Sequence, residues 1–174
     1  MREIIFKNVI IFIDTFFKKI ENIIREEMDN AGAREILMPS LQPASLWKES
    51  KRFGKMGKDM IIFKDRHNRE MLLGPTHEEV VSDIVRKYVK SWKNLPLMLY
   101  QIQTKYRDEI RPRFGIIRSR EFLMKDCYSF DRSDNDAENS YFLMRQTYEK
   151  IFKRCGLNVS VQTADSGVIG GKFS

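Results

Sequence analysis

The chain has 174 residues, of which 42% are hydrophobic and 32% are charged. That balance is typical of a folded globular protein rather than a disordered one, and the length allows one domain with a hydrophobic core. The net charge of +7 at neutral pH is compatible with a polyanionic partner such as RNA, although many small basic proteins bind no nucleic acid.

The cysteines, the histidines and the N-terminal segment exclude several other classes of protein. Cys127 and Cys155 lie far apart and predict reduced thiols in a cytoplasmic setting. Two Cys and two His without the paired spacing of zinc sites predict no metal site made by the protein. The apolar stretch 4–13 is too short to span a bilayer and is followed by Asp14, so we expect a core helix, no signal peptide and no membrane partner.

The first part of the chain predicts a long helix followed by a short strand. Apolar residues between Val9 and Met28 recur at the spacing of one helix face, and Gly32 supplies a stop. Residues 33–38 are typical of a short strand that ends at Pro39.

A hairpin and a second helix are predicted next. Residues 60–63 and 69–73 are two predicted strands joined by a turn at 65–68. Residues 76–90 are a predicted helix with a buried apolar stripe. The stripe consists of Val80, Val81, Ile84, Val85, Tyr88 and Val89.

Two long strands around a basic loop follow. Residues 97–109 alternate in the manner of a strand, residues 110–115 form a loop, and residues 116–130 return as a second strand. One predicted face of the first strand carries Tyr100, Ile102, Thr104 and Tyr106, and the other carries Gln101, Gln103, Lys105, Arg107 and Glu109.

The last part of the chain predicts a helix and a final strand. Residues 134–155 have the amphipathic pattern of a helix, which Gly156 would end. Residues 157–163 alternate in the manner of a strand, and a Gly-rich tail covers 167–171. Together these elements predict an α+β fold, an antiparallel β-sheet flanked by helices.

Five arginines fall within a stretch of 14 residues that belongs to the two long strands and their loop. They are Arg107, Arg111, Arg113, Arg118 and Arg120. A planar guanidinium donates two parallel hydrogen bonds and therefore suits phosphate and carboxylate oxygens. Alternation from position 118 would also put two of these arginines on one face with Phe122 and Met124, a surface for a phosphate chain and a ring. The alternative is a solvated edge hairpin whose charges discourage aggregation.

The same segment resembles motif 2 of class II aminoacyl-tRNA synthetases, in the form found in bacterial-type prolyl-tRNA synthetases. The resemblance rests on RDEIRPRFG at 107–115 and REFLMKD at 120–126. It extends to GPTHEE at 74–79, similar to the family's substrate-recognition loop, and to LYQIQT at 99–104, similar to the strand that enters motif 2. Several long motifs in the family's order are far more specific than one short pattern.

The resemblance also covers both ends of the chain from Lys19 onward. KIENIIREEM at 19–28 and LMP at 37–39 resemble motif 1, in which a helix and a strand build a dimer interface. ADSGVIGG at 164–171 resembles the point where the family continues into its editing domain. Residues 1–17 do not resemble the family.

The resemblance implies an incomplete class II synthetase catalytic fold. Residues 1–163 would be part of the catalytic domain, with motif 1 at about 19–39 and motif 2 at about 97–130, and 164–174 would begin the connection to the editing insertion. Motif 3 and the anticodon-binding domain have no counterpart here, so we expect an incomplete active site. We also expect the polar face of the motif 2 hairpin to be poorly covered.

The resemblance implies that four residues of this chain bind ATP. Arg107 would be the catalytic residue and would contact both the α-phosphate and the amino-acid carboxylate. Arg118 would bind ATP from the second strand, Glu109 would place the adenine side, and Phe122 would pack near the nucleotide. The alternative for each arginine is a surface salt bridge. Mg²⁺ would accompany ATP, with no metal ligand assigned to the chain.

The resemblance also implies residues that bind proline and residues that contact tRNA(Pro). Thr76 and Glu78 would hold the proline imino group, with Arg107 on the carboxylate. Arg111 and Arg113 would contact the tRNA acceptor stem, with a solvated loop as the alternative.

Two further interpretations remain open at this stage. Thr76 to Glu79 also reads as a capping box, with Thr76 at the N-cap and Glu79 three residues later, while His77 has no assigned chemistry. The expected function is that of a proline–tRNA ligase of the cytoplasm, a homodimer when intact. The alternative is a non-catalytic, synthetase-like protein that binds RNA or a partner synthetase.

Overall fold

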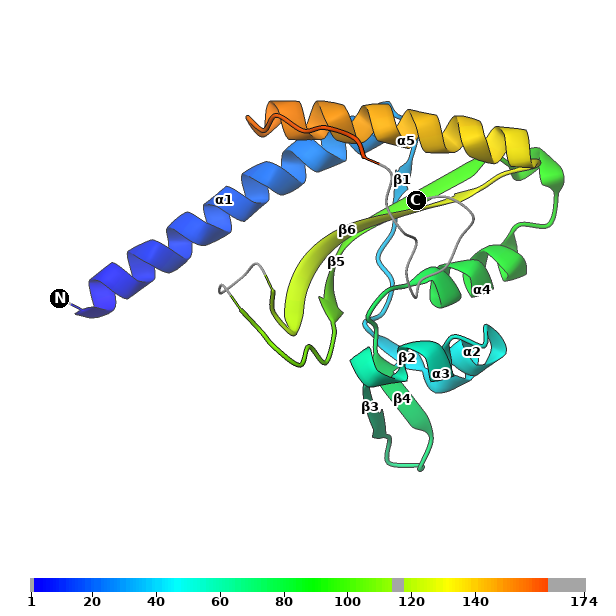
Figure 1. Ribbon diagram of the computed structural model, residues 1–174, viewed down its shortest axis with the longest axis horizontal. Coiled ribbons are helices and arrows are strands. Elements are labelled where there is room, and N and C mark those ends of the chain that lie inside the picture. Colours follow the sequence, from blue (N-terminus) through cyan, green and yellow to red (C-terminus); the bar gives the residue numbers. More distant parts are fainter. Residues whose placement is uncertain (1, 114–117, 163–174) are drawn as a thin grey trace. The chain divides into compact units, whose positions relative to one another are not determined.

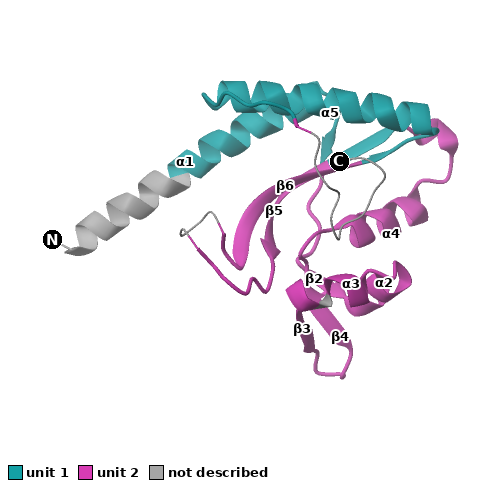
Figure 2. Cartoon of the chain, in the orientation of Figure 1, with its two compact units in different colours: residues 1–35, 96–99, 129–161 teal, residues 36–95, 100–128, 162–174 magenta. Residues whose placement is uncertain are grey.

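The structure is a computed structural model that describes residues 2–113 and 118–162 (Figure 1). The chain divides into two compact units, which are considered separately (Figure 2). Unit 1 comprises residues 1–35, 96–99 and 129–161, and unit 2 comprises residues 36–95, 100–128 and 162–174. In the described ranges, no helix is both long and apolar enough to cross a membrane.

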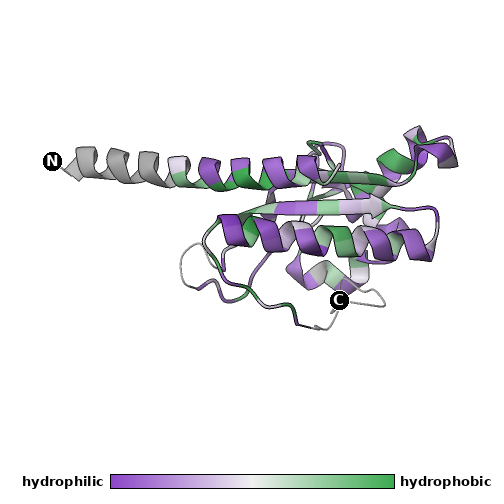
Figure 3. Ribbon diagram, turned by 90° about the horizontal axis from the view of Figure 1, so that it is seen from above, coloured by the Kyte–Doolittle hydropathy of each residue, from purple (hydrophilic) through white to green (hydrophobic). Residues whose placement is uncertain are grey.

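Unit 1 is built around two helices, α1 (Arg2–Asn30) and α5 (Asp134–Arg154). Both helices end at a glycine in the left-handed region, Gly32 at φ +81° and Gly156 at φ +77°, where a side chain would be strained. Hydrophilic and hydrophobic residues alternate along α5 (Figure 3). Its buried side chains include Met144 and Ile151, so the amphipathic pattern supplies the packing face.

Ion pairs join the two helices of unit 1. Arg154, in the last turn of α5, lies 2.5 Å from Glu26 and 2.8 Å from Glu27 of α1. Met28 of α1 is fully buried. The short strand β1 (Arg34–Glu35) follows, and Glu35 accepts from Arg25 Nε at 3.0 Å.

Unit 2 contains a small antiparallel sheet in the order β2-β4-β3. Its strands are β2 (Leu41–Pro43), β3 (Ile61–Lys64) and β4 (Glu70–Leu73). Two short helices, α2 (Ala44–Glu49) and α3 (Phe53–Met56), and a 3₁₀ helix at Gly57–Asp59 complete this region. Its core cluster consists of Ala44, Trp47, Met56, Met60 and Leu72.

The longer elements that lie wholly or mainly in unit 2 carry the polar residues of interest. Helix α4 covers Glu78–Tyr88, and residues 74–77 form the β4–α4 loop before it. After a 3₁₀ turn at Trp92–Asn94, strand β5 covers Leu97–Tyr106 and strand β6 covers Glu121–Phe130. The three-stranded sheet has the order β1-β5-β6.

Most predicted elements are confirmed, including the α+β class, the hairpin at 61–73 and both long helices. Helix α4 is shorter than predicted, and Tyr88 of its stripe is 78% exposed while Ile84 is also exposed. Strand β6 begins at Glu121, so Arg118 precedes it. The predicted strand at 157–163 is wrong for 157–162, which form no strand, and Thr163 lies outside the described residues with the tail at 167–171.

Part of the polar face of β5 is covered in the structure, where the expectation was a poorly covered hairpin, while Gln103 is only partly buried. The side chains of Gln101 and Lys105 are fully buried, while Tyr100 on the other face is buried as well. Partners within unit 2 account for this burial, because both polar side chains contact Asp126 of β6. A buried polar group needs such partners to offset its lost hydration.

Candidate active site

The β4–α4 loop is held on both sides by hydrogen bonds. The N–H of Gly74 donates to Ser40 O at 2.8 Å, and the N–H of Tyr106 donates to Gly74 O at 3.1 Å. Gln42 Nε2 donates to Thr76 O at 3.0 Å. A Cβ at Gly74 would lie 2.3 Å from that nitrogen, so position 74 has room only for glycine.

The amide of Gln42 is itself fixed at both ends. Trp47 Nε1 donates to Gln42 Oε1 at 2.8 Å, and both side chains are fully buried. The loop is therefore tied to the core cluster through Thr76, Gln42 and Trp47, and no exposed side chain takes part in this connection.

A buried charged network lies behind the loop. Lys105 Nζ is 2.9 Å from Asp126 Oδ1 and 2.7 Å from His77 Nδ1. Tyr128 donates its hydroxyl proton to Asp126 Oδ2 at 2.6 Å and accepts from the N–H of His77 at 3.1 Å. Gln101 Nε2 donates to the same Oδ2 at 2.9 Å. Each member has at least one partner within the network, although Asp126 Oδ1 faces Lys105 as an ion pair without accepting a hydrogen bond.

The contacts of His77 determine its tautomer. Its Nδ1 accepts from the Lys105 ammonium, so Nε2 carries the proton and donates to Pro39 O at 3.1 Å. Burial lowers the pKa of His77, and the charge of Lys105 lowers it further. Burial also lowers the pKa of Lys105 against the opposing effect of Asp126, and burial raises the pKa of Tyr128. His77 is accordingly a neutral, structural histidine.

Three of the predicted site residues meet at the loop. Thr76 Oγ1 donates to Glu78 Oε2 at 2.5 Å. Arg107, just past the end of β5, donates through Nε and Nη2 to Pro75 O, each at 3.4 Å. A hydroxyl, a carboxylate and a guanidinium therefore lie around one short segment, which suits a ligand with both a cationic and an anionic group.

Phe122 lies against the same arginine. The Arg107 guanidinium carbon is 5.4 Å from the centre of the Phe122 ring, within the range of a cation–π contact. Thr76, Glu78, Arg107 and Phe122 thus form one connected group in unit 2.

Glu109 and Arg118 form a separate pair. Arg118 Nε lies 2.9 Å from Glu109 Oε2, and Glu109 Oε1 accepts from the N–H of Arg111 at 3.1 Å. The hydrogen bond from Arg118 holds the pKa of Glu109 below its usual range. The salt-bridge alternative thus describes Arg118, whose side chain is 59% exposed, but not Arg107, whose guanidinium contacts a carbonyl and a ring.

Arg111 and Arg113 lie on the exposed loop between the two long strands. The N–H of Arg113 donates to Arg118 O at 3.0 Å, which continues the pairing of the hairpin beyond β5 and β6. No ion pair involves either guanidinium among the described residues. Residues 114–117 of the predicted basic loop lie outside the described residues.

The predicted capping box does not form. The N-cap of α4 is His77, without a side-chain capping bond, and Thr76 donates to Glu78 instead. Glu79 turns to Arg52 at 2.9 Å and to Ser50 at 2.9 Å. The stronger charged partner thus takes the carboxylate that a capping box would use.

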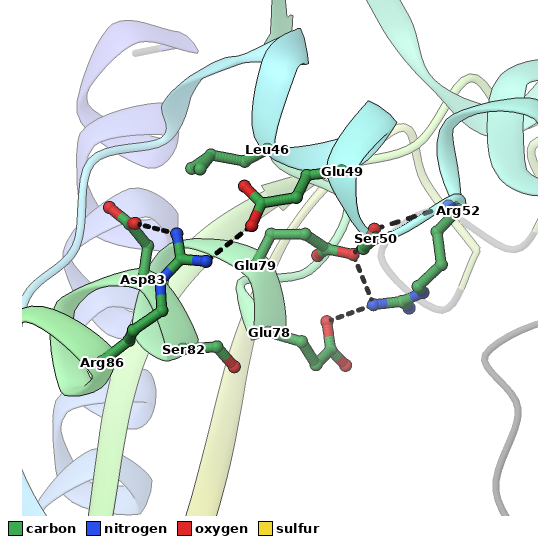
Figure 4. A pocket seen from close by; sticks show the side chains of 9 residues that line it. All are labelled: Leu46, Glu49, Ser50, Arg52, Glu78, Glu79, Ser82, Asp83 and Arg86. Carbon is green, nitrogen blue, oxygen red and sulfur yellow. Dashed lines mark hydrogen bonds and ion pairs between the residues drawn. The ribbon is translucent and has the colours of Figure 1, made fainter.

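A pocket of about 280 Å³ opens beside Glu78, between α2 and α4 (Figure 4). Its charged lining consists of Glu49, Arg52, Glu78, Glu79, Asp83 and Arg86. Two arginines lie among the carboxylates, and each bridges two of them (Figure 4). Among the described residues, no group of three metal-ligand side chains is placed to hold an ion.

Sequence reasoning missed the residues that hold the site in place. Lys105, Asp126, Tyr128 and His77 received no role, because their pairing joins β5, β6 and the β4–α4 loop. The one available signal was a lysine in β5 and an aspartate in β6, whose opposite charges can pair across a hairpin. Arg52 offered none, since its partners Glu78 and Glu79 lie in a distant helix.

A family model covers residues 61–170, and its description is tRNA synthetase class II core domain (G, H, P, S and T). Curated relatives named proline–tRNA ligase come from Geobacter metallireducens, Solidesulfovibrio magneticus and a Wolbachia of Drosophila simulans. They are 59%, 60% and 60% identical to this chain over 90%, 89% and 90% of its length. The chain spans 28%, 27% and 37% of their lengths.

Two solved structures have a similar fold. The Giardia lamblia prolyl-tRNA synthetase in complex with prolyl-adenylate matches at a TM-score of 0.72 and 24% identity, over 78% of this chain and 28% of that one. The RNA-binding domain of threonyl-tRNA synthetase from Cryptosporidium parvum matches at 0.74 and 23% identity, over 80% and 35%. At these identities the likeness concerns the fold alone.

Proposed function

The chain belongs to the family of tRNA synthetase class II core domains, and on that premise we propose that it is part of a proline–tRNA ligase. The proposed reaction joins the carboxylate of proline to the α-phosphate of ATP with release of pyrophosphate. Transfer of the prolyl group to a hydroxyl at the end of tRNA(Pro) follows, with release of AMP. The observation that carries the proposal is the meeting of Thr76, Glu78 and Arg107 at the β4–α4 loop.

The amino-acid side of the proposed site consists of Thr76 and Glu78. The carboxylate and the hydroxyl oxygen would accept the two N–H groups of the secondary ammonium of proline. The proline carboxylate would then lie toward Arg107, since the guanidinium is on the adjoining Pro75. Charge-assisted hydrogen bonds of this kind are about twice as strong as neutral ones.

Arg107 is the proposed catalytic residue. When the carboxylate attacks the α-phosphorus, negative charge increases on the phosphate oxygens, and a fixed cation lowers the barrier to this step. Phe122 would keep the guanidinium in place and pack beside the nucleotide, while Glu109 and Arg118 would bind ATP. Their mutual ion pair would have to open or shift to admit the nucleotide.

Mg²⁺ would be bound together with ATP, without a ligand from this chain. Glu109, the carboxylate among the proposed ATP-binding residues, is already engaged by Arg118 and by the N–H of Arg111. The described residues therefore do not fit a protein-made magnesium site, and no step is assigned to the ion.

The remaining partners are also proposed. Arg111 and Arg113 would contact phosphates of the tRNA acceptor stem. Residues 19–39 would form a homodimer interface, supported by the apolar side chain of Leu37, which is 76% exposed. The reaction would take place in the cytoplasm.

We further propose that residues 1–163 are one part of a class II catalytic domain, with motif 1 at about 19–39 and motif 2 at about 97–130. Residues 164–174 would lead toward an editing insertion. Motif 3 and an anticodon-binding domain would lie outside these 174 residues.

The proposal is tested by proline-dependent exchange of pyrophosphate into ATP. Two proteins are compared: this chain alone and an extended protein, in which the chain is continued by the remaining segments of one of the curated relatives. Exchange by the extended protein alone is the expected result. Exchange by neither would favour the non-catalytic alternative, and exchange by both would contradict the proposed need for motif 3.

A further inference from the structure

We propose that Arg52 is a positioning residue that orients the carboxylate of Glu78 toward the ammonium group of the amino-acid substrate. The inference rests on the proposed function, in which Glu78 binds the amine of proline. Arg52 belongs neither to motif 1 nor to motif 2 and reaches the site from the segment between α2 and α3.

The guanidinium of Arg52 is held by the core cluster. Its Cζ lies 5.3 Å from the centre of the Trp47 ring, and Nη2 lies 3.6 Å from Met56 Sδ. The backbone N–H of Arg52 donates to Trp47 O at 3.1 Å. Only 15% of the side chain is exposed. An arginine stacked in this way has lost most of its rotamer freedom before any ligand arrives.

One nitrogen of this guanidinium joins two neighbouring carboxylates. Nη1 is 2.9 Å from Glu79 Oε1 and 3.3 Å from Glu78 Oε2 (Figure 4). Glu79 is the fixed partner, because its side chain is 3% exposed and Ser50 donates to the same oxygen at 2.9 Å. Glu78 is the more exposed of the two carboxylates, at 35%. Because the Arg52 guanidinium is held by the buried Glu79, its contact with Glu78 also restricts the orientation of the Glu78 carboxylate.

The geometry leaves one oxygen of Glu78 for a ligand. Oε2 receives the hydroxyl of Thr76 at 2.5 Å as well as Arg52. Within the described residues, no hydrogen bond or ion pair reaches Oε1. Because Thr76 donates to Glu78, its own oxygen keeps lone pairs that can accept.

These two acceptors match the two N–H groups of a secondary ammonium. A primary ammonium carries three and would need a further acceptor. The arrangement thus favours a cyclic amino acid whose nitrogen is part of the ring, and Arg52 maintains it by keeping Oε2 occupied.

The test compares Arg52→Met, Arg52→Lys and Arg86→Met in the extended protein. Arg86 lines the same pocket and bridges Glu49 and Asp83 without contacting Glu78, so it is a matched control. The readouts are the KM for proline and for ATP in pyrophosphate exchange, and the inhibition constant of cyclopentanecarboxylate. This inhibitor keeps the ring and carboxylate of proline but has no amine.

We expect Arg52→Met to raise the KM for proline at least tenfold, while the KM for ATP and the inhibition constant change less than twofold. Arg52→Lys keeps the charge and should recover part of the loss. Arg86→Met should leave all three constants within twofold.

A parallel rise of the inhibition constant and the KM for proline would overturn the inference, since a general distortion affects both ligands. An unchanged KM for proline would overturn it too. If Arg52→Met does not fold, Arg52→Lys decides by the same ratio. Absence of proline-dependent exchange in the unsubstituted extended protein would instead refute the proposed function.

Discussion

At the scale of single residues, the site combines one partly buried carboxylate, Glu78, with a buried network that fixes its surroundings. Thr76, Glu78 and Arg107 could be named from a motif, because a motif records which groups touch a ligand. His77, Lys105 and Asp126 could not, because their importance depends on burial and on pairing between strands. Sequence alternation indicated the face of Lys105 but not that this face is enclosed.

The first prediction concerns Glu78. Its replacement by Gln removes the negative charge opposite the proposed ammonium, and hydrogen bonds to charged groups contribute about 1.5–3 kcal/mol. We expect the KM for proline to rise by roughly 10- to 100-fold and the KM for ATP to change little. Pyrophosphate exchange by the extended protein measures both. Glu49→Gln removes a carboxylate of the same pocket that pairs with Arg86 rather than Arg52, and it should leave the KM for proline unchanged.

The second prediction concerns the acid sensitivity of the buried network. The pKa of His77 is below 6.5 in the folded protein because of burial and Lys105, with smaller opposing effects from Asp126 and Glu78. The unfolded chain therefore takes up a proton as the pH falls through 6.5, whereas the folded protein does not. This unequal uptake favours unfolding by up to about 1.4 kcal/mol per pH unit.

Urea denaturation between pH 7.5 and 5.5 measures this effect. His77→Gln should be less stable at every pH but should lose this part of the pH dependence. His67→Gln, at an exposed turn position, should keep it. An identical pH dependence in all three proteins would refute the assignment of His77 as a buried neutral histidine.

At the scale of elements, prediction succeeded where the signals are local. Helix α5 is preceded by its N-cap, Ser133, and ends before Gly156, and both residue types are recognisable as helix boundaries in the sequence. The hairpin at 61–73 has an equally local turn, since Asp65 accepts from the N–H groups of His67 and Arg69. The strand predicted at 157–163 failed because alternation alone does not supply a pairing partner: the apolar Leu157, Val159 and Val161 remain about half exposed.

The third prediction concerns the start of α5. The Ser133 side chain accepts from the N–H of Asp136 at 3.2 Å, and Ser133→Ala removes this cap at a cost of about 1 kcal/mol. Amide hydrogen exchange in the first turn of α5 should accelerate, and the midpoint of urea unfolding should fall. Asn139→Ala, at an exposed position inside the same helix, should not lower the midpoint, because alanine is the better helix former.

At the scale of the whole molecule, the structure shows which of the basic side chains behind the net charge of +7 form ion pairs and which do not. Many basic side chains are engaged by carboxylates, as Arg154, Arg86 and Arg52 are. Arg111 and Arg113 are exposed and, within the described residues, form no ion pair, which makes them available to a polyanion. The amino-acid composition alone could not tell the arginines that form ion pairs from those that are available to a polyanion.

The fourth prediction follows from this difference. The double substitution Arg111→Gln and Arg113→Gln in the extended protein should weaken tRNA binding and leave proline-dependent exchange unchanged. The slope of log affinity against log salt should shrink by roughly 0.7–0.9 for each phosphate that the protein no longer neutralises. Filter binding at several salt concentrations measures the slope. Lys150→Gln, on the exposed side of α5, is the charge-matched control and should leave the slope unaltered.

The enclosed indole of Trp47 makes the proposed site optically accessible. Trp47 is fully buried under the Arg52 guanidinium and hydrogen-bonded to Gln42, whereas Trp92, the other tryptophan, is 65% exposed. Emission from Trp47 should therefore lie to the blue of Trp92, and Trp92→Phe should isolate it. Because the indole is one side chain away from both Thr76 and Glu78, ligand capture at the β4–α4 loop should change its intensity. An intrinsic fluorescence titration could then follow proline binding directly, without isotope or coupled enzyme.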